Sequence, residues 1–449
     1  MSKNKFFATL FMIIFILFPV CANAYEEPAV QLVVQNGDSL IELCNKYLEN
    51  PKQWKKIAEI NRLENPDLIY PGQTLLIPAN LLKELPADGI VSFIKGNVEY
   101  QSDVGTAWKP LHLNDRVKEG FKIRTGDDGI IEIMLEDGIS FLQSQNTVIG
   151  LSTVRKSGSS QSNYKLFLHT GRTITNIKGA TGREPRFYIE TPSAICAARG
   201  TVFRTSVDAS DFTRSEVLEG KVDVEAMNKK VKVGENEGTL VKKGLAPMEP
   251  QKLLSPPAPV NLSPMYKNIP LHVDFRKVEG AVSYRIIVAR DKDCKDILKE
   301  QVIKPTESFT IHTVDDGTYF LQSRSIDNLG LEGIPSDMAF IKVRVNPLPP
   351  MIESPVDKAV YKEASLTLRW LKVENAVRYQ LEIAEDKEFN KIVTTRADIQ
   401  DREYHTGKLD FKTYYFRIRS IAKDDYQGEW SDILSFSVSP SQNDQKNIP

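Results

Sequence analysis

The side chains of this 449-residue chain that could carry a reaction are few. The five histidines fall in no His-Glu-x-x-His or comparable zinc pattern, and the chain has neither a Gly-x-Ser-x-Gly turn nor a phosphate-binding loop. The adjacent acids Asp315-Asp316 and Asp424-Asp425 fall in expected turns, where solvated aspartate is ordinary. We therefore expect no enzyme, no cofactor and no metal site. Sequence leaves open only a pair of carboxylates brought together by the fold, as in a glycosidase.

Three cysteines follow the first 24 residues, namely Cys44, Cys196 and Cys294. An odd number, spread over three predicted domains, argues against a disulfide framework. Cys44 lies on the predicted inner face of a helix and Cys196 lies in an apolar strand pattern, so we expect both to be small buried hydrophobic residues. Cys294 aligns with Phe389 in the repeat described below, which also indicates a packing role.

The first 24 residues predict a secretory signal. Lys3 and Lys5 precede the apolar run 6–18, and Ala22-Asn23-Ala24 supplies a small-x-small cleavage site. Cys21 is not expected to be lipidated, because the three residues before it lack the small residue that such processing needs. We therefore expect an exported protein of the periplasm or cell envelope.

Charge and hydropathy exclude two further classes. Losing the two lysines of the signal changes the formal charge from −1 to −3, and the remaining charge is dispersed, which does not suggest nucleic-acid binding. No later stretch is apolar enough for a transmembrane span in the mature chain. The length predicts about three domains.

Residues 31–78 predict a strand, two helices and a second strand. Asp38 can cap the first helix. Asn50-Pro51 predicts a restart, with asparagine as the N-cap and proline at the first helical position. The apolar positions of the first helix recur at helical spacing and are Leu40, Ile41, Cys44, Tyr47 and Leu48.

Through these residues the segment resembles a LysM module over the module's whole length, which we place at 30–79. LysM modules bind glycans that contain N-acetylglucosamine, above all peptidoglycan, in a shallow groove between the loop after the first strand and the loop before the second. Taken alone, Asp38 is better explained as a helix cap than as a ligand. Ser39 stands where threonine is more usual but keeps a hydroxyl group. The resemblance places in the groove Gly37, Asp38, Ser39, Leu40, Asn65, Pro66, Asp67, Leu68 and Ile69.

After the LysM-like segment the pattern changes to short alternating runs divided by Asp-Gly turns, which predicts an all-β domain over 88–246. This region resembles a FecR-type domain through Trp108, the stretch 120–143, and Thr191-Pro192 followed by Ala198-Arg199-Gly200-Thr201. The namesake proteins relay a siderophore signal across the inner membrane with a cytoplasmic anti-sigma segment and a transmembrane helix. We expect neither segment here, so the resemblance implies an extracytoplasmic β-domain and not that signalling role.

The motif Arg199-Gly200-Thr201 has two explanations. It could be a ligand site. Alternatively, Gly200 relieves the backbone at a tight crossing while Arg199 pairs with a carboxylate. We favour the second explanation, because glycines at special positions are usually conformational.

Two copies of one repeat end the chain. Residues 247–264 are proline-rich and polar and predict an extended linker. The copies span 265–345 and 350–440, at a constant offset of 95 residues. Each copy alternates with strand period and resembles a fibronectin type III or Ig-like module.

The second copy carries two arginines, Arg417 and Arg419, on one strand face. Trp430 should lie on the next strand, so we expect an arginine–tryptophan stack that forms a structural ladder. The alternative is that exposed aromatic residues mark a partner site.

We therefore predict a mainly β, multidomain protein with a small βααβ LysM module, an all-β FecR-type domain and two β-sandwiches in tandem. The expected function is a non-catalytic envelope adaptor that binds peptidoglycan and presents its C-terminal modules to another envelope protein. One alternative is a periplasmic sensor of a ligand or partner through the FecR-type domain. A second alternative is a cryptic wall hydrolase.

Overall fold

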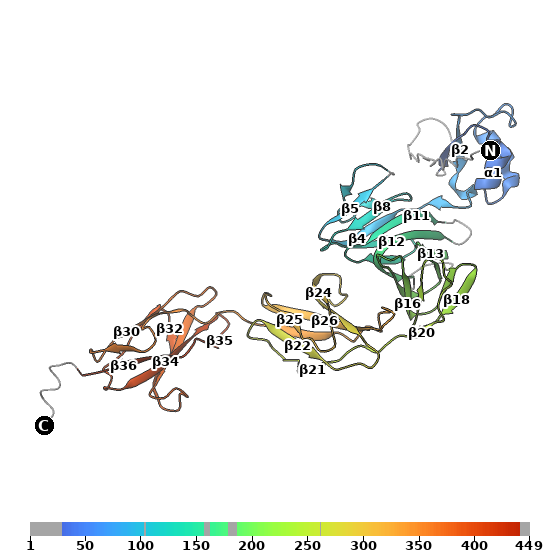
Figure 1. Ribbon diagram of the computed structural model, residues 1–449. Coiled ribbons are helices and arrows are strands. Elements are labelled where there is room, and N and C mark those ends of the chain that lie inside the picture. Colours follow the sequence, from blue (N-terminus) through green and yellow to red (C-terminus); the bar gives the residue numbers. More distant parts are fainter. Residues whose placement is uncertain (1–28, 103–104, 157–161, 178–185, 261, 441–449) are drawn as a thin grey trace, which may run out of the picture. The chain divides into compact units, whose positions relative to one another are not determined.

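The computed structural model describes residues 29–102, 105–156, 162–177, 186–260 and 262–440 (Figure 1). The expected signal, with Cys21, lies outside these residues. The chain divides into two compact units: the first comprises the chain up to Leu254 together with Ile326–Ile334, and the second comprises Ser255–Ser325 and the chain from Pro335. Across the described ranges, no helix combines the length and the apolar character needed to cross a membrane.

The N-terminal domain has the predicted strand–helix–helix–strand order. Its elements are β1 (Ala29–Val33), α1 (Leu40–Tyr47), the 3-10 turn η1 (Pro51–Gln53), α2 (Trp54–Ile60), β2 (Thr74–Pro78) and the 3-10 turn η2 (Ala79–Leu81). β1 and β2 pair antiparallel, with Val33 opposite Thr74. The core between the sheet and the helices includes Leu32, Val34, Leu43, Cys44, Ile57 and Leu75.

The cap of α1 differs from the prediction. Ser39 is the N-cap: its backbone is extended (φ −114°, ψ 154°), and its hydroxyl accepts a hydrogen bond from the Glu42 amide at 3.3 Å. The Asp38 carboxylate instead accepts the Gln35 amide at 2.7 Å and so closes the preceding turn. The expectation that Asp38 caps the helix was therefore wrong by one residue.

The inward face of α1 also differs from the prediction. Ile41 is 52% exposed, whereas Leu43 is buried beside Leu40 and Cys44. Positions 40, 43 and 44 share one face of a helix, and position 41 is rotated by one residue away from it. The start of the second helical segment was predicted correctly. Asn50 is the N-cap of η1, and its Oδ1 accepts the Lys52 amide at 3.1 Å.

The strands of the FecR-like region of the first unit close into a barrel, in which the long strand β12 (Asn163–Asn176) pairs with different neighbours along its two halves. The first half of β12 pairs with β11 (Val148–Lys156) and β13 (Arg186–Glu190), and its second half pairs with β10 (Ser140–Gln143) and β15 (Val202–Val207). Their buried faces form one apolar core, which includes Phe141, Phe187 and Phe203. The other strands are β3 (Leu85–Pro86), β4 (Gly89–Lys95), β5 (Val98–Gln101), β6 (Lys109–Pro110), β7 (Arg116–Val117), β8 (Lys122–Thr125), β9 (Ile130–Leu135), β14 (Ile195–Ala198), β16 (Thr213–Glu219), β17 (Val222–Ala226), β18 (Lys229–Val233), β19 (Glu237–Val241) and β20 (Gln251–Lys252).

The second unit holds the two repeats as β-sandwiches, each with its own apolar core. The first sandwich contains β21 (Pro259–Val260), β22 (Leu271–Phe275), β23 (Ser283–Ala289), β24 (Ile297–Ile303), β25 (Phe309–Ile311), β26 (Gly317–Ile326) and β27 (Ala339–Val343). The second contains β28 (Ile352–Ser354), β29 (Ala359–Tyr361), β30 (Thr367–Trp370), β31 (Arg378–Ala384), β32 (Ile392–Ile399), β33 (Glu403–His405), β34 (Thr413–Ile421), β35 (Gln427–Trp430) and β36 (Leu434–Val438). Matching residues of the two repeats form matching strands. β23 lies between β24 and β26 in the first sandwich, and β31 lies between β32 and β34 in the second.

The predicted arginine–tryptophan stack is present in the second sandwich. The guanidinium carbons of Arg417 and Arg419 lie 4.4 Å and 4.3 Å from the centre of the Trp430 ring. Arg417 also lies 4.1 Å from the Phe389 ring centre and donates two hydrogen bonds to Glu382. These contacts form a ladder along the sheet face and favour the structural explanation.

Candidate glycan-binding site

The strand pair of the N-terminal domain brings the two predicted groove loops to one end of the sheet. Because β1 and β2 run antiparallel, the chain leaves β1 at the end where it enters β2. The Val34 amide donates to the Gln73 carbonyl at 2.8 Å, and the Gly72 amide donates to the Val34 carbonyl at 2.9 Å. These bonds extend the pairing beyond the strands and join the bases of the two loops.

The conformation of the first loop is fixed by a glycine turn and by the cap of α1. Gly37 has a φ of +90°, a backbone conformation that other residues rarely adopt. The Glu42 carboxylate in turn accepts hydrogen bonds from the Ser39 amide at 3.3 Å and from the Ser39 hydroxyl at 2.9 Å. These reciprocal bonds complete a capping box. The Leu40 side chain is buried in the core, so only its backbone faces the loop.

The second loop presents a mixed polar and apolar surface. Asn65 Oδ1 accepts the Asp67 amide at 3.0 Å, and its carbonyl accepts the Leu68 amide at 3.1 Å, which forms a tight turn. Asn65 and Asp67 are exposed, Pro66 is half-buried, and Ile69 is half-buried against the core. Leu68 is 55% exposed, although it is a large apolar residue in a structured turn.

Two further residues belong to this surface and were missed at the sequence level. Tyr70 is 63% exposed next to the turn, and Gln73 accepts the Tyr70 amide through its side-chain oxygen at 3.0 Å. An aromatic residue directly before Pro71-Gly72 is the signal that could have indicated Tyr70. Binding of a sugar ring requires apolar contact and hydrogen bonds. Leu68 and Tyr70 can supply the apolar contact, and the carboxylates and backbone groups of the loops can supply the hydrogen bonds.

The Arg199-Gly200-Thr201 motif of the FecR-like region has a structural role. Gly200 has a φ of +57°. Thr201 is fully buried, and its hydroxyl lies 2.8 Å from the Arg199 carbonyl and 2.9 Å from the Lys221 carbonyl. The motif therefore closes a turn between strands, as expected for Gly200, whereas the pairing of Arg199 with a carboxylate stays a prediction.

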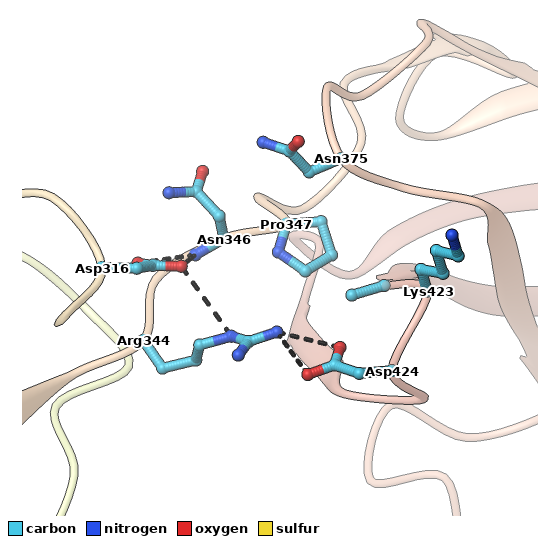
Figure 2. A pocket seen from close by; sticks show the side chains of 8 residues that line it. Asp316, Arg344, Asn346, Pro347, Asn375, Lys423 and Asp424 are labelled. Carbon is cyan, nitrogen blue, oxygen red and sulfur yellow. Dashed lines mark hydrogen bonds and ion pairs between the residues drawn. The ribbon is translucent and has the colours of Figure 1, made fainter.

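A shallow charged hollow lies in the second unit (Figure 2). Figure 2 shows the Arg344 guanidinium between two aspartates: Nη2 lies 2.9 Å from Asp424 Oδ1, and Nε lies 3.8 Å from Asp316 Oδ2. Asp316 Oδ1 also accepts the Val345 amide at 2.7 Å. The Arg344 charge is thus compensated by two carboxylates, although its Nε forms no hydrogen bond, and we assign the hollow no ligand. In the described ranges, no group of three or more histidine, cysteine or acidic side chains is placed to hold a metal ion.

Comparisons with known proteins support two of the domains. Residues 32–78 match the LysM domain family, and residues 121–223 match the FecR protein family. Both are non-catalytic binding or regulatory domains that are typical of envelope proteins. A protein from Deinococcus radiodurans, described only as uncharacterized, is 49% identical over 45 residues, which cover 10% of this chain and 18% of that protein. The chain thus spans less than a fifth of that relative.

Solved structures show weaker likenesses. A candidate anti-sigma factor from Parabacteroides distasonis has a TM-score of 0.25 at 17% identity, covering 29% of this chain and 59% of that one. The fibronectin(III)-like modules of Clostridium thermocellum CbhA have a TM-score of 0.21 at 13% identity, covering 42% of this chain and 95% of theirs. These likenesses establish no function. By its matched families and its own strands, the chain combines a LysM domain and a FecR-type domain with two C-terminal β-sandwiches.

Proposed function

We propose that this protein is a non-catalytic component of the cell envelope that binds N-acetylglucosamine-containing glycan, above all peptidoglycan, through its LysM domain. The observation that carries the proposal is the convergence of two ordered loops at one end of the β1–β2 sheet, with Leu68 and Tyr70 exposed between polar backbone turns. Leu68 and Tyr70 are two residues apart in one loop, and contiguous exposed apolar surface is typical of ligand-binding grooves.

The site proposed for the glycan keeps the residues expected from the resemblance, but their roles differ. Asp67, Leu68 and neighbouring backbone groups are the accessible contacts, and Tyr70 is added to them. Ser39 and Leu40 support the loop, because one caps α1 and the other is buried. A single shallow groove binds weakly, so we propose that the polymer's repeated sites raise the overall affinity.

The test is a pull-down on purified peptidoglycan with the chain that begins at Tyr25. Leu68→Asp should reduce binding at least about tenfold, because it replaces apolar contact with a desolvated charge. The matched control is Leu113→Asp, a change of the same chemistry at a leucine that is 54% exposed in the FecR-type domain. Deleting residues 25–80 should abolish binding. Equal binding by Leu68→Asp and the control would exclude this groove as the site.

The remaining domains are proposed to act as a scaffold from that anchor, with the C-terminal modules available to an envelope protein. A sensor role for the FecR-type domain is the second candidate, and one observation favours it: a charged face of its sheet holds a peptide segment, as described next. The hydrolase alternative has no supporting site among the described residues, and cleared peptidoglycan in a zymogram would revive it.

A further inference from the structure

One outer sheet face of the FecR-type domain is charged and yet buried. In the sheet formed by β12, β15, β16 and β19, Arg204 lies opposite Glu216 across β15 and β16, and Glu216 lies opposite Gly238. Arg204 is only 5% exposed and Glu216 only 2%. Charged side chains are almost never fully buried unless they are paired, so something must cover this face.

The cover is the segment Ile326–Ile334, which belongs to the same compact unit although it is distant in sequence. We call its turn, residues 327–333, the docked turn. We call the surface formed by Arg172, Arg204, Arg214, Glu216 and Gly238 the arginine face.

The arginine face binds the backbone of the docked turn. Arg204 Nη2 donates to the carbonyls of Glu332 and Gly333, the latter at 2.8 Å. Arg214 Nε donates to the Leu329 carbonyl at 2.7 Å. Glu216 Oε1 accepts the Glu332 amide at 3.2 Å. Hydrogen bonds to the main chain of a bound segment give affinity, and pockets for its side chains give specificity.

Two side chains of the docked turn add selectivity. The Glu332 carboxylate lies 3.1 Å from Arg172 Nη1 and 3.9 Å from Arg204 Nη1. Leu331 is buried against Gly238, where an added Cβ atom would approach Leu331 Cδ2 to 3.2 Å. The arginine face therefore fits an apolar residue followed directly by a carboxylate.

The docked turn holds its own shape. Asp327 Oδ1 accepts the amides of Leu329 and Leu331, both at 2.9 Å. Gly330 has a φ of +77°, and an added Cβ atom there would lie 2.7 Å from Arg214 Nε. A preformed turn loses little conformational entropy on docking, which favours binding as a ligand.

The buried charges of the arginine face carry a desolvation cost. Burial raises the pKa of Glu216, so its ionised form is held at a cost in free energy. Arg204 Nε lies 3.5 Å from Glu216 Oε2 without forming a hydrogen bond. A buried ion pair is weak evidence for stability, because the cost of removing both charges from water offsets much of their attraction.

We propose that the arginine face is a peptide-binding site for a turn bearing a leucine–glutamate pair, and that the docked turn is its resident ligand. A partner protein with such a turn binds by taking the place of the resident one. This site is independent of the glycan groove, so the two proposals fail or stand separately.

The test uses the full chain from Tyr25 with residues 328–333 replaced by glycine and serine at unchanged length. A fluorescent peptide of sequence DNLGLEGIP, residues 327–335 of this chain, is titrated by anisotropy. It should bind the replaced chain at least about tenfold more tightly than the unaltered chain, whose face is occupied. The same peptide carrying Glu332→Gln should bind at least about tenfold more weakly, because it loses a charge-assisted contact.

Arg172→Ala in the replaced chain should weaken peptide binding, whereas Lys165→Ala, on the same strand and paired with Glu190, should not. A Glu332→Gln change in the otherwise intact chain loosens the resident turn without replacing it, so peptide binding should exceed that of the unaltered chain. Peptidoglycan binding should stay constant throughout. Failure of the peptide to bind both the replaced and the Glu332→Gln chains, or equal binding of the two peptides, would overturn the proposal.

Discussion

The Asn61 side chain pairs with both backbone groups of Leu76. Asn61 Oδ1 accepts the Leu76 amide at 2.6 Å, and Asn61 Nδ2 donates to the Leu76 carbonyl at 2.7 Å. The same Nδ2 also donates to the Ile57 carbonyl at 2.8 Å. One amide thus ends α2 and fixes the outer edge of β2, and the second groove loop lies between these two elements.

We expect Asn61→Ala to destabilise the LysM domain by roughly 2 kcal/mol, because it leaves the backbone of Leu76 without these partners. Amide hydrogen exchange on the intact chain measures this without assuming two-state unfolding of a multidomain protein. Exchange of the α2 and β2 amides should be roughly 30-fold faster. Asn45→Ala, at an exposed position of α1, is the matched control and should leave exchange unchanged. Similar exchange in both variants would show that the Asn61 contacts are dispensable.

Ser39 allows the folding and binding roles of the first groove loop to be separated. Ser39→Ala removes the capping hydroxyl and should cost about 1 kcal/mol in the stability of α1, whereas Ser39→Thr keeps the hydroxyl and should cost little. Since we assign Ser39 to the cap, glycan binding by Ser39→Ala should recover at low temperature or with added osmolyte, measured by the same pull-down. Persistent loss of binding in a folded Ser39→Ala domain would make the hydroxyl a direct glycan contact.

The thiols should be inert in the folded chain. Burial raises the pKa of Cys44 to about 11, of Cys196 to about 12 and of Cys294 to about 11. Since thiolates are the reactive form, a disulfide reagent at pH 8 should label the three thiols only after denaturation. Rapid labelling of the native chain would contradict the burial seen here.

The same thiols predict a pH dependence with a defined sign. The folded pKa values lie above the unfolded value near 9.0, so the unfolded chain ionises first as the pH rises. The contribution of these protonated thiols to the free energy of unfolding is complete below pH 9. It is lost progressively as the pH rises towards 11 and 12. Urea unfolding followed in this range should show the decline, and Cys196→Ala should make it less steep. An identical slope in Cys196→Ala would mean that other groups cause the decline.

Trp430 should stabilise the second sandwich through its two arginine contacts. Trp430→Leu keeps an apolar side chain but loses the stacked guanidinium groups of Arg417 and Arg419, so we expect a cost of about 1–2 kcal/mol. Hydrogen exchange of β34 and β35 reports the effect locally. Phe340→Leu is the control, since that exposed ring packs on Phe320 in the first sandwich. Unchanged exchange in Trp430→Leu would favour the alternative that this half-buried aromatic residue belongs to a partner site.

Local patterns were enough to predict most of the elements. The βααβ order of the LysM domain, the Asn50 cap, the β-rich middle and the repeat at a constant offset all depend on neighbouring residues, whose preferences act over a few positions. Two local assignments failed: the cap is Ser39 and not Asp38, and Leu43 and not Ile41 is in the core. The side of α1 that is buried is set by packing against the rest of the domain, which the local pattern does not contain.

The sequence by itself determined the LysM and FecR-type resemblances, the tandem repeat and the positions of the two groove loops. Only the tertiary structure showed that Tyr70 shares the groove surface and that Arg204 and Glu216 are buried beneath Glu332. In a strand, alternating charged residues predict a solvent-facing side. Here that side is covered by the docked turn, which lies more than a hundred residues further along the chain. Such a contact has no local sequence signal, because it arises only when the folded sheet meets a distant turn of matching charge and shape.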